Sequence, residues 1–307
     1  MEYFATSSKA SKQSSDCVIV GVFERNKLGA AAADIDKASK GVLTRLMKTG
    51  DISGQRGRAE VLTSLPNVRA KRVVVVGLGK PSRFNAGRFR KAVSAAMHAI
   101  SKTKTAAIAN YLALEDVKDT DSYYLGRHTA EAIGDVMYRY DETKSGRKPP
   151  RVPLKKIGVG VANRKDVNRS VTGLKHGDAI SAGMSVAKEL GNLPPNICTP
   201  SYLARFAQKM ARGNKNLSAK ILNETEMKRL GMGSLLSVTA GAAKPAKMVI
   251  LQYKGGKKEA PVVLVGKGVT FDTGGISLKP GAAMDEMKFD MCGAAGVIGT
   301  MATVAKL

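Results

Sequence analysis

The sequence predicts an α/β protein: an open α/β domain at the N-terminus, then a connecting helix, then a second α/β region. Two observations carry this prediction. Apolar runs rich in β-branched residues, most of them ended by glycine, alternate with segments in which apolar residues recur at helical spacing. The connections between these segments are short, which is typical of an open sheet covered by helices. With 307 residues, the chain is long enough for about two domains.

The first region alternates strands with helices. Its predicted buried strands are the apolar runs at residues 17–23, 72–80 and 106–114. Its predicted helices follow the first two strands, at residues 30–50 and 88–102. The polar, proline-containing residues 141–153 are predicted to form a boundary loop, and residues 157–162 a last strand.

A long helix predicted at residues 168–190 leads to the second region. We therefore expect an N-terminal α/β domain over residues 1–150, a linker and connecting helix over 151–192, and a second domain over 193–307. The helices predicted in the last part are residues 203–213, 224–231 and 291–307. The strands predicted there are residues 218–223, 247–255 and 260–268. Because the PVVLV run in the last of these is wholly apolar, we expect a buried central strand.

The composition is that of an ordinary globular protein, with 43% hydrophobic and 24% charged residues. No run approaches the roughly 18 apolar residues of a membrane-spanning helix, so we expect no membrane association. Residues 1–16 lack the apolar core of a signal peptide. The three cysteines are odd in number and widely spaced, which argues against a disulfide framework, and no CxxC pair indicates a structural zinc site. The expected location is therefore the cytoplasm.

The net charge of +25 is the feature that departs most from the average. Residues 61–114 contain ten Lys and Arg and no acidic residue. Such a balance favours binding of polyanions, because Lys and Arg that neutralise phosphates release counterions. The alternative is a solvated basic surface that aids solubility. We favour the second interpretation, since the basic residues are dispersed and are not interleaved with aromatic residues.

Three further features give only weak functional signals. The segment GLGKPS at residues 77–82 follows a predicted strand, but Ser82 stands where a dinucleotide-binding motif has its third glycine, so a strand-ending turn is expected. The two cysteines Cys198 and Cys292 have no histidine nearby in sequence that would activate a thiol nucleophile. The three histidines are His98, His128 and His176. None of them has a second metal-ligating residue at the sequence spacing that is usual for metal sites, so they do not indicate such a site.

One stretch concentrates amines and carboxylates among glycines. Residues 266–290 read GKGVTFDTGGISLKPGAAMDEMKFD and follow the PVVLV run directly. Open α/β sheets bind their ligands at the carboxyl ends of strands, where Lys267 and Asp272 would lie. Each candidate also has an ordinary structural role: Asp290 as the N-cap of the following helix, Asp272 in an Asx-turn, and Lys267 and Lys279 as solvated surface groups.

A metal site is the chemical alternative for this stretch. Hard divalent cations take several oxygen ligands, of which Asp272 and Asp290 supply two. A lysine amine ligates a cation only when it is deprotonated, and the field of the cation and partial burial both favour that form. A second lysine that keeps its proton would stabilise an oxyanion. The sequence pattern leaves open whether these groups converge.

The longer segment GKGVTFDTGGISLKPGAAMDEMKFDMCGAAGVIGTM resembles the leucyl aminopeptidases, or cytosol aminopeptidases, and above all their bacterial aminopeptidase A branch. GNLPPNICTPSYLA at residues 191–204 resembles the Asn-x-Pro-Pro-Asn segment that opens the catalytic domain of that family. The strands CVIVGVFE and RVVVVGLGK also resemble this branch, so the resemblance spans the chain. It implies a two-domain homo-hexamer in which residues 193–307 are the first part of an α/β two-metal aminopeptidase domain.

The resemblance also implies roles for single residues. Lys267, Asp272 and Asp290 resemble the ligands of the more tightly held metal, and Asp272 also bridges to the second metal. Lys279 resembles the active-site lysine that holds the substrate carbonyl and the tetrahedral intermediate, and Met287 a wall of the pocket for the N-terminal side chain. The implied cofactors are two divalent metal ions, with Mn²⁺ or Zn²⁺ expected first. The implied substrates are peptides, and the implied reaction is hydrolysis of the first peptide bond by a metal-activated water, which releases the N-terminal residue.

The sequence departs from the family pattern in one respect. A second motif of the family, Asn-Thr-Asp-Ala-Glu-Gly-Arg, supplies further metal ligands, and the 307 residues do not contain it. We therefore expect a C-terminally truncated version with little or no peptidase activity by itself. The alternative function implied by the same bacterial branch is a DNA-binding accessory or regulatory protein that holds duplex DNA on its basic surface.

Overall fold

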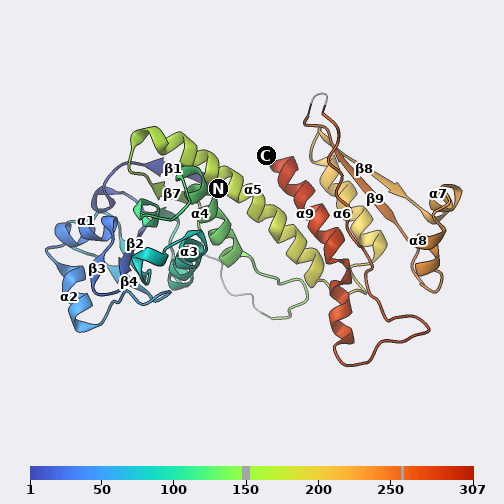
Figure 1. Ribbon diagram of the computed structural model, residues 1–307, viewed down its shortest axis with the longest axis horizontal. Helices are drawn as coiled ribbons and strands as arrows, with labels where there is room; N and C mark the ends of the chain where they lie inside the picture. The colour runs from blue at the N-terminus through green and yellow to red at the C-terminus, as the bar shows by residue number, and fades with distance from the viewer. Residues whose placement is uncertain (147–152, 257–258) are drawn as a thin grey trace. The chain divides into compact units, whose positions relative to one another are not determined.

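The computed structural model describes residues 1–146, 153–256 and 259–307. The chain divides into two compact units, of which the first comprises Met1–Arg139 and Arg147–Ser181 and the second Tyr140–Gly146 and Ala182–Leu307. Each unit combines helices with strands (Figure 1), so the predicted α/β class is confirmed. Among the described residues, no helix is long and apolar enough to cross a membrane.

The first unit is built on a seven-stranded, mostly parallel sheet. Its strand order is β1-β7-β6-β2-β5-β4, with the short β3 paired to β2 outside this path. Only β3 and β4 run antiparallel to their neighbours. The strands are Glu2–Thr6 (β1), Cys17–Phe23 (β2), Lys27–Leu28 (β3), Ala59–Thr63 (β4), Arg72–Gly77 (β5), Ala107–Asn110 (β6) and Lys156–Gly160 (β7). All four strands predicted in this part of the chain form.

The central strand β2 explains why the sheet is covered on both faces. All seven of its residues are buried. Ile19 and Phe23 pack into one apolar cluster with the helices α3 and α4, whereas Val18, Val20 and Val22 pack into another with α1 and α2. Because successive side chains of a strand point to opposite faces, a strand that is apolar throughout needs an apolar layer on each side.

The helices of the first unit are α1 (Ala30–Ala38), α2 (Val42–Thr49), α3 (Ala86–Ile100), α4 (Ser122–Met137) and the start of α5 (Val167–Asn192). Short 3₁₀ turns lie at Ala10–Lys12 (η1), Pro81–Arg83 (η2), Leu112–Leu114 (η3) and Arg164–Asp166 (η4). The prediction of one helix over residues 30–50 is wrong. Lys40 and Gly41 have φ angles of 59° and 79°, and this left-handed backbone ends α1 and lets α2 begin in a new direction.

The helices α4 and α5 approach each other closely at glycines. A Cβ atom on Gly173 would lie 2.0 Å from the backbone oxygen of Tyr123, and one on Gly126 would lie 2.4 Å from that of Ser170. Real Cβ atoms essentially never come within 3.0 Å of a heavy atom to which they are not linked through neighbouring bonds. The two helix backbones therefore touch directly, and only glycine fits at these positions.

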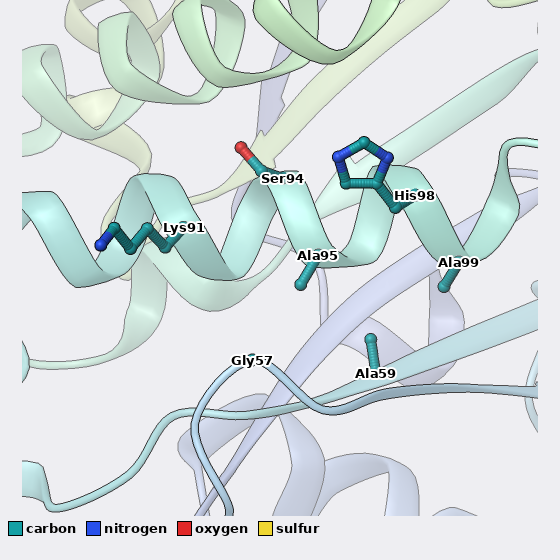
Figure 2. Close-up of a pocket in the computed structure, with 7 residues that line it drawn as sticks. All are labelled: Gly57, Ala59, Lys91, Ser94, Ala95, His98 and Ala99. Carbon is teal, nitrogen blue, oxygen red and sulfur yellow. The ribbon is translucent and has the colours of Figure 1, made fainter.

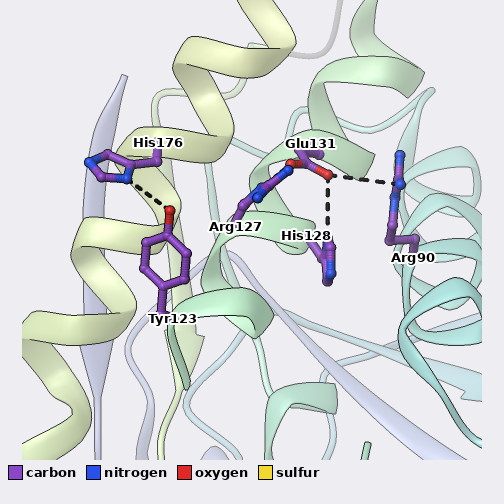
Figure 3. Close-up of polar contacts among 6 residues, drawn as sticks. All are labelled: Arg90, Tyr123, Arg127, His128, Glu131 and His176. Carbon is purple, nitrogen blue, oxygen red and sulfur yellow. Dashed lines mark hydrogen bonds and ion pairs between the residues drawn. The ribbon is translucent and has the colours of Figure 1, made fainter. Parts of the chain in front are cut away.

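A buried carboxylate of α4, Glu131, is directed toward α3. Glu131 is 4% exposed and accepts a hydrogen bond of 2.6 Å from Arg127, while a ring nitrogen of His128 lies 3.3 Å away and Arg90 3.9 Å away (Figure 3). Burial by itself raises the pKa of Glu131, but the hydrogen bonds from His128 and Arg127 outweigh it and hold that pKa below its usual value. The ionised carboxylate thus ties two helices together.

The second unit contains the rest of α5 and a two-stranded antiparallel sheet. Its strands are Leu217–Leu222 (β8) and Met248–Tyr253 (β9). Its helices are Pro200–Arg212 (α6), Glu224–Arg229 (α7), Gly233–Val238 (α8) and Cys292–Lys306 (α9), with a 3₁₀ segment at Met284–Met291 (η5). The core of this unit joins Leu190 of α5 and Leu203 of α6 to Ile298 of α9.

The predicted strand at residues 260–268 does not form, so this part of the prediction is wrong. Val262 and Val265 are 90% and 92% exposed, and residues 259–269 have no strand assignment. A strand needs a neighbouring backbone for its hydrogen bonds, and in the described part of the chain β8 and β9 pair only with each other. Apolar character alone therefore does not place this run in a core.

A second carboxylate, Glu115, is partly buried at the start of α1. A Cβ atom on Gly29 would lie 2.3 Å from its Oε1, which has no hydrogen-bond partner, and the N–H of Ala30 donates to the same carboxyl group. Burial is the largest effect and raises the pKa of Glu115 from 4.5 to about 7. The fold therefore favours the protonated form of this side chain.

We predict that Glu115→Gln stabilises the protein at pH 8 and has little effect at pH 5. Between pH 4.5 and about 7 the unfolded chain loses the Glu115 proton before the folded chain does, so the free energy of unfolding falls as the pH rises. The loss is at most about 3 kcal/mol, because each pH unit between the two pKa values is worth about 1.4 kcal/mol. Urea unfolding at both pH values measures the difference, and a pH-independent difference between variant and parent would contradict the prediction.

We predict that Gly173→Ala lowers the free energy of unfolding by about 1–3 kcal/mol, because the new methyl group forces α4 and α5 apart. The matched control is Gly87→Ala in α3, where the nearest atom would lie 3.6 Å from the added Cβ. That change should leave stability unchanged or raise it by up to about 1 kcal/mol. Urea unfolding followed by circular dichroism compares the two, and equal effects would show that the helix contact is not tight.

Candidate functional site

Lys267 is fixed through its backbone on the first turn of α9. The N–H of Ala294 donates a hydrogen bond of 2.7 Å to the carbonyl oxygen of Lys267. A Cβ atom on Gly266 would lie 2.4 Å from the carbonyl oxygen of Gly293, and one on Gly293 would lie 2.9 Å from the amide nitrogen of Lys267. The two glycines thus let the chain lie against the helix. The support for Lys267 is this helix and not the strand that the sequence predicted.

The helix α9 is itself positioned by a close contact with α5. A Cβ atom on Gly183 of α5 would lie 2.3 Å from the carbonyl oxygen of Gly299 in α9, and one on Gly299 would lie 2.5 Å from that of Gly183. Buried Ala295 and Ile298 of α9 join the apolar core of the second unit. The start of α9, on which Lys267 rests, is therefore part of a well-packed helix pair.

The first pair of candidate residues is Lys279 with Asp272. The amine of Lys279 lies 2.8 Å from Oδ2 of Asp272 and donates to the sulfur of Met287 at 3.1 Å. Oδ1 of Asp272 accepts a hydrogen bond of 2.9 Å from the N–H of Gly274, so the expected Asx-turn is present. One carboxylate oxygen thus shapes the turn and the other holds the lysine, and the structure brings Lys279, Asp272 and Met287 together.

The second pair is Lys267 with Asp290. The amine of Lys267 lies 2.9 Å from Oδ1 of Asp290, with side-chain exposures of 59% and 19%. The N-cap residue of α9 is Met291, and no side-chain hydrogen bond caps the helix, so Asp290 does not have the capping role that ordinary helix chemistry predicts. Its second oxygen, Oδ2, is buried and has no hydrogen-bond partner in the part of the chain that the structure describes. A buried acceptor without a hydrogen bond lowers the stability of the fold unless a donor or a cation satisfies it.

The two pairs interact electrostatically. The hydrogen bond from Lys279 is the largest effect on the pKa of Asp272 and lowers it, and the N–H of Gly274 and the charge of Lys267 act in the same direction. Lys267 therefore acts on both aspartates, although its ion pair is with Asp290. No hydrogen bond or ion pair between described residues joins one pair to the other.

The residues present match part of a metal site. One segment carries two lysine–aspartate ion pairs, and the Oδ2 of Asp290, which has no partner among the described residues, is an acceptor that a cation would satisfy. Each lysine would have to lose its proton, and with it the present ion pair, before its nitrogen could ligate a metal. Within the described ranges, no three His, Cys, Asp or Glu side chains gather closely enough to hold a metal ion. The fit is therefore to a partial ligand set.

The weaker sequence signals have structural explanations. The GLGKPS segment is a strand-ending turn, as predicted, because β5 ends at Gly77 and Gly79 has a φ of 76°. His128 contacts Glu131, and a ring nitrogen of His176 lies 2.9 Å from the hydroxyl of Tyr123 (Figure 3). Neither histidine belongs to a group of metal ligands among the described residues.

A hollow of about 480 Å³ lies between α3 and β4. Ala95 and Ala99 of α3 point toward Ala59 of β4, whereas Ser94 and His98 point to the other side of the helix (Figure 2). Lys91, Ser94 and His98 also contribute to its lining, so small apolar groups alternate there with an amine, a hydroxyl and an imidazole, and no carboxylate lines it. It offers no chemistry comparable to that of the lysine–aspartate pairs.

Comparison with known protein families finds two matches, both to one family. Residues 19–147 match the N-terminal domain of the cytosol aminopeptidase family, and residues 185–307 match its catalytic domain. The second match contains all five residues of the candidate site: Lys267, Asp272, Lys279, Met287 and Asp290.

Individual relatives agree with this assignment. The chain is 46% identical over its full length to a probable cytosol aminopeptidase of Alkalilimnicola ehrlichii and 40% identical to a cytosol aminopeptidase of Vibrio cholerae. It spans 62% and 61% of these two proteins. Among solved structures, a mutant of tomato leucine aminopeptidase matches 99% of this chain and 59% of its own, with a TM-score of 0.80 and 25% identity. The bottromycin maturation enzyme BotP in complex with Mn matches 95% of this chain and 56% of its own, with a TM-score of 0.72 and 28% identity.

The two domain matches together cover most of the chain and follow each other in the order in which the family has them. The tomato leucine aminopeptidase structure reproduces the fold of nearly all of it. This protein belongs to the cytosol aminopeptidase family.

Proposed function

We propose that this chain carries part of the active site of a metal-dependent aminopeptidase, which releases N-terminal amino acids from peptides. The observation that carries the proposal is the placement of Lys279 on Asp272 and Lys267 on Asp290, at 2.8 Å and 2.9 Å, inside the segment that matches the catalytic domain of the family. At this separation the charge of each amine acts directly on its carboxylate, so a cation bound beside them would alter the protonation of both groups.

The proposed cofactors are two divalent metal ions, Mn²⁺ or Zn²⁺. The similarity to BotP in complex with Mn supports the first of these. When bound, such ions activate a water molecule for attack on the peptide carbonyl. Lys267, Asp272 and Asp290 would hold them, with Asp272 shared between the two. The buried Oδ2 of Asp290 supports this assignment, because a cation would satisfy it.

Lys279 has a different proposed role. Its amine rests between Asp272 and the sulfur of Met287. In the protonated form it would donate to the substrate carbonyl oxygen and stabilise the negative charge that develops there. Met287 would form part of the apolar wall for the side chain of the residue to be released, since thioether side chains adapt to irregular apolar surfaces.

Asp272→Asn should weaken Mn²⁺ binding at least about tenfold, because the amide keeps the shape of the carboxylate but removes its charge. Calorimetric titration of the purified chain with Mn²⁺ measures the affinity. The matched control is Glu60→Gln, which neutralises one partner of the exposed Arg58–Glu60 pair in the first unit. Equal losses in both variants, or no loss in the first, would argue against a metal role for Asp272.

The 307-residue chain by itself should hydrolyse leucine p-nitroanilide slowly or not at all with saturating Mn²⁺. The physical reason is the partial ligand set, since within the described ranges no third His, Cys, Asp or Glu joins the two aspartates. A full-length relative assayed in parallel provides the positive control. Robust Mn²⁺-dependent hydrolysis by this chain would show that the ligands present suffice for the reaction.

Duplex DNA binding is a second candidate function, favoured by the net charge of +25. If the binding is electrostatic, affinity in gel-shift experiments should fall steeply between about 50 and 200 mM salt. Affinity that does not change over this range would reject it. We also propose that the protein forms the homo-hexamer implied by the family resemblance. We propose a location in the cytoplasm as well, which the names of the relatives support.

A further inference from the structure

The first unit has a hollow of about 320 Å³ beyond the carboxyl ends of the parallel strands β2 and β5. Glu24 follows β2 directly, and Gly79 and Lys80 follow the end of β5. The remaining lining residues are Gln55, Arg56, Arg83 and Arg88. Open α/β sheets bind ligands beyond this end of their strands, and the volume lies at the lower end of the range for small-molecule sites.

Backbone contacts fix the floor of this hollow. The N–H of Gly79 donates to the carbonyl oxygen of Gly54 at 2.8 Å, and the N–H of Glu24 donates to that of Gly79 at 3.0 Å. A Cβ atom on Gly54 would lie 2.1 Å from the carbonyl group of Phe23, and one on Gly77 would lie 2.0 Å from the carbonyl oxygen of Gln55. The loops that carry the lining side chains are therefore packed backbone against backbone. The backbone of such a site needs little reorganisation on binding.

The charge of the hollow is strongly unbalanced. Four cations, Arg56, Lys80, Arg83 and Arg88, line it with the single carboxylate of Glu24. Among the described residues, none of the four cations has an ion-pair or side-chain hydrogen-bond partner. Three of them belong to residues 61–114, which contain no acidic residue. A recess lined mainly by one sign of charge concentrates counterions of the other sign.

We propose that this hollow binds a small phosphorylated compound through a diphosphate group. Arginine presents a planar fork of donors that matches phosphate oxygens, and lysine adds a point charge. Four cations match the several negative charges of a diphosphate better than the single charge of a carboxylate. Glu24 lies beside Gly79, where its oxygen can accept from a hydroxyl or amino group elsewhere in the ligand.

The recessed shape separates this proposal from duplex DNA binding. A duplex presents its phosphates along the outside of a stiff rod, whereas a hollow of about 320 Å³ accepts a compound small enough to enter it. The incomplete glycine motif is consistent with this, since side-chain cations supply the contacts that a glycine-rich loop makes with its backbone amides in other phosphate sites. The site is also independent of the proposed aminopeptidase chemistry, because its residues belong to the first unit.

The test is calorimetric titration of the 307-residue chain with sodium pyrophosphate and with ADP, in metal-free buffer at about 150 mM salt. The double variant Arg83→Gln/Arg88→Gln removes two charges from the hollow. The matched control Lys12→Gln/Arg69→Gln removes two exposed charges near the opposite, amino end of β5. We expect the first variant to lose at least about tenfold in affinity for both probes and the control to keep the affinity of the parent chain.

Three outcomes would overturn the proposal. One is that the parent chain binds neither probe at millimolar concentration. Another is that both double variants lose affinity equally, which would indicate attraction by net charge alone. The third is that duplex DNA binding is sensitive to Arg83 and Arg88 while the parent chain fails to bind pyrophosphate, which would assign the basic hollow to nucleic acid. Circular dichroism melts of all variants show whether each still folds.

Discussion

Carboxylates are scarce in this protein, which has 25 Asp and Glu against 50 Lys and Arg, and several of them hold basic side chains or backbone N–H groups in place. Asp16 pairs with Lys71 and accepts the N–H groups of Ala106 and Ala107, which ties the start of β2 to the strand beside it. Glu131 gathers basic side chains between two helices. Asp272 and Asp290 each hold one lysine in the candidate site.

The same scarcity explains the cationic hollow at the ends of β2 and β5. Residues 61–114 supply basic side chains and no carboxylate, so the cations that they place at one edge of the sheet have a single acidic neighbour, Glu24. Like charges at one edge repel unless solvent or a bound anion screens them. The two proposed sites therefore differ in charge: the candidate metal site pairs each aspartate with one lysine, whereas four cations and one carboxylate line the hollow.

Glycine is the second constraint on the fold, because each unit contains a pair of helices whose backbones are in direct contact. Gly126 and Gly173 let α4 lie against α5, and Gly183 and Gly299 do the same for α5 and α9. Close packing of this kind leaves little freedom to shift one helix against the other. It fixes the first turn of α9, and the backbone of Lys267 rests on that turn. The position of a candidate functional amine thus follows from residues that carry no side chain.

The sequence by itself determined a part of the local structure: β-branched runs identified β2, β5 and β9, and the spacing of apolar residues identified α3 and the long α5. The unusual density of amines and carboxylates in one short stretch also singled out Lys267, Asp272, Lys279 and Asp290, whereas Met287 was named only through the family resemblance. It missed β1, which is stabilised by pairing with β7 about 150 residues later, and α4, although Asp121 accepts the N–H groups of Tyr123 and Tyr124 as an N-cap would. Only the tertiary structure decided which carboxylate each lysine holds, that the apolar residues 261–265 lie exposed, and that four cations share one hollow. Those outcomes depend on which segments, distant in sequence, lie side by side in the fold. Neither the hydrophobic periodicity nor the composition of a segment specifies which segments will be its neighbours.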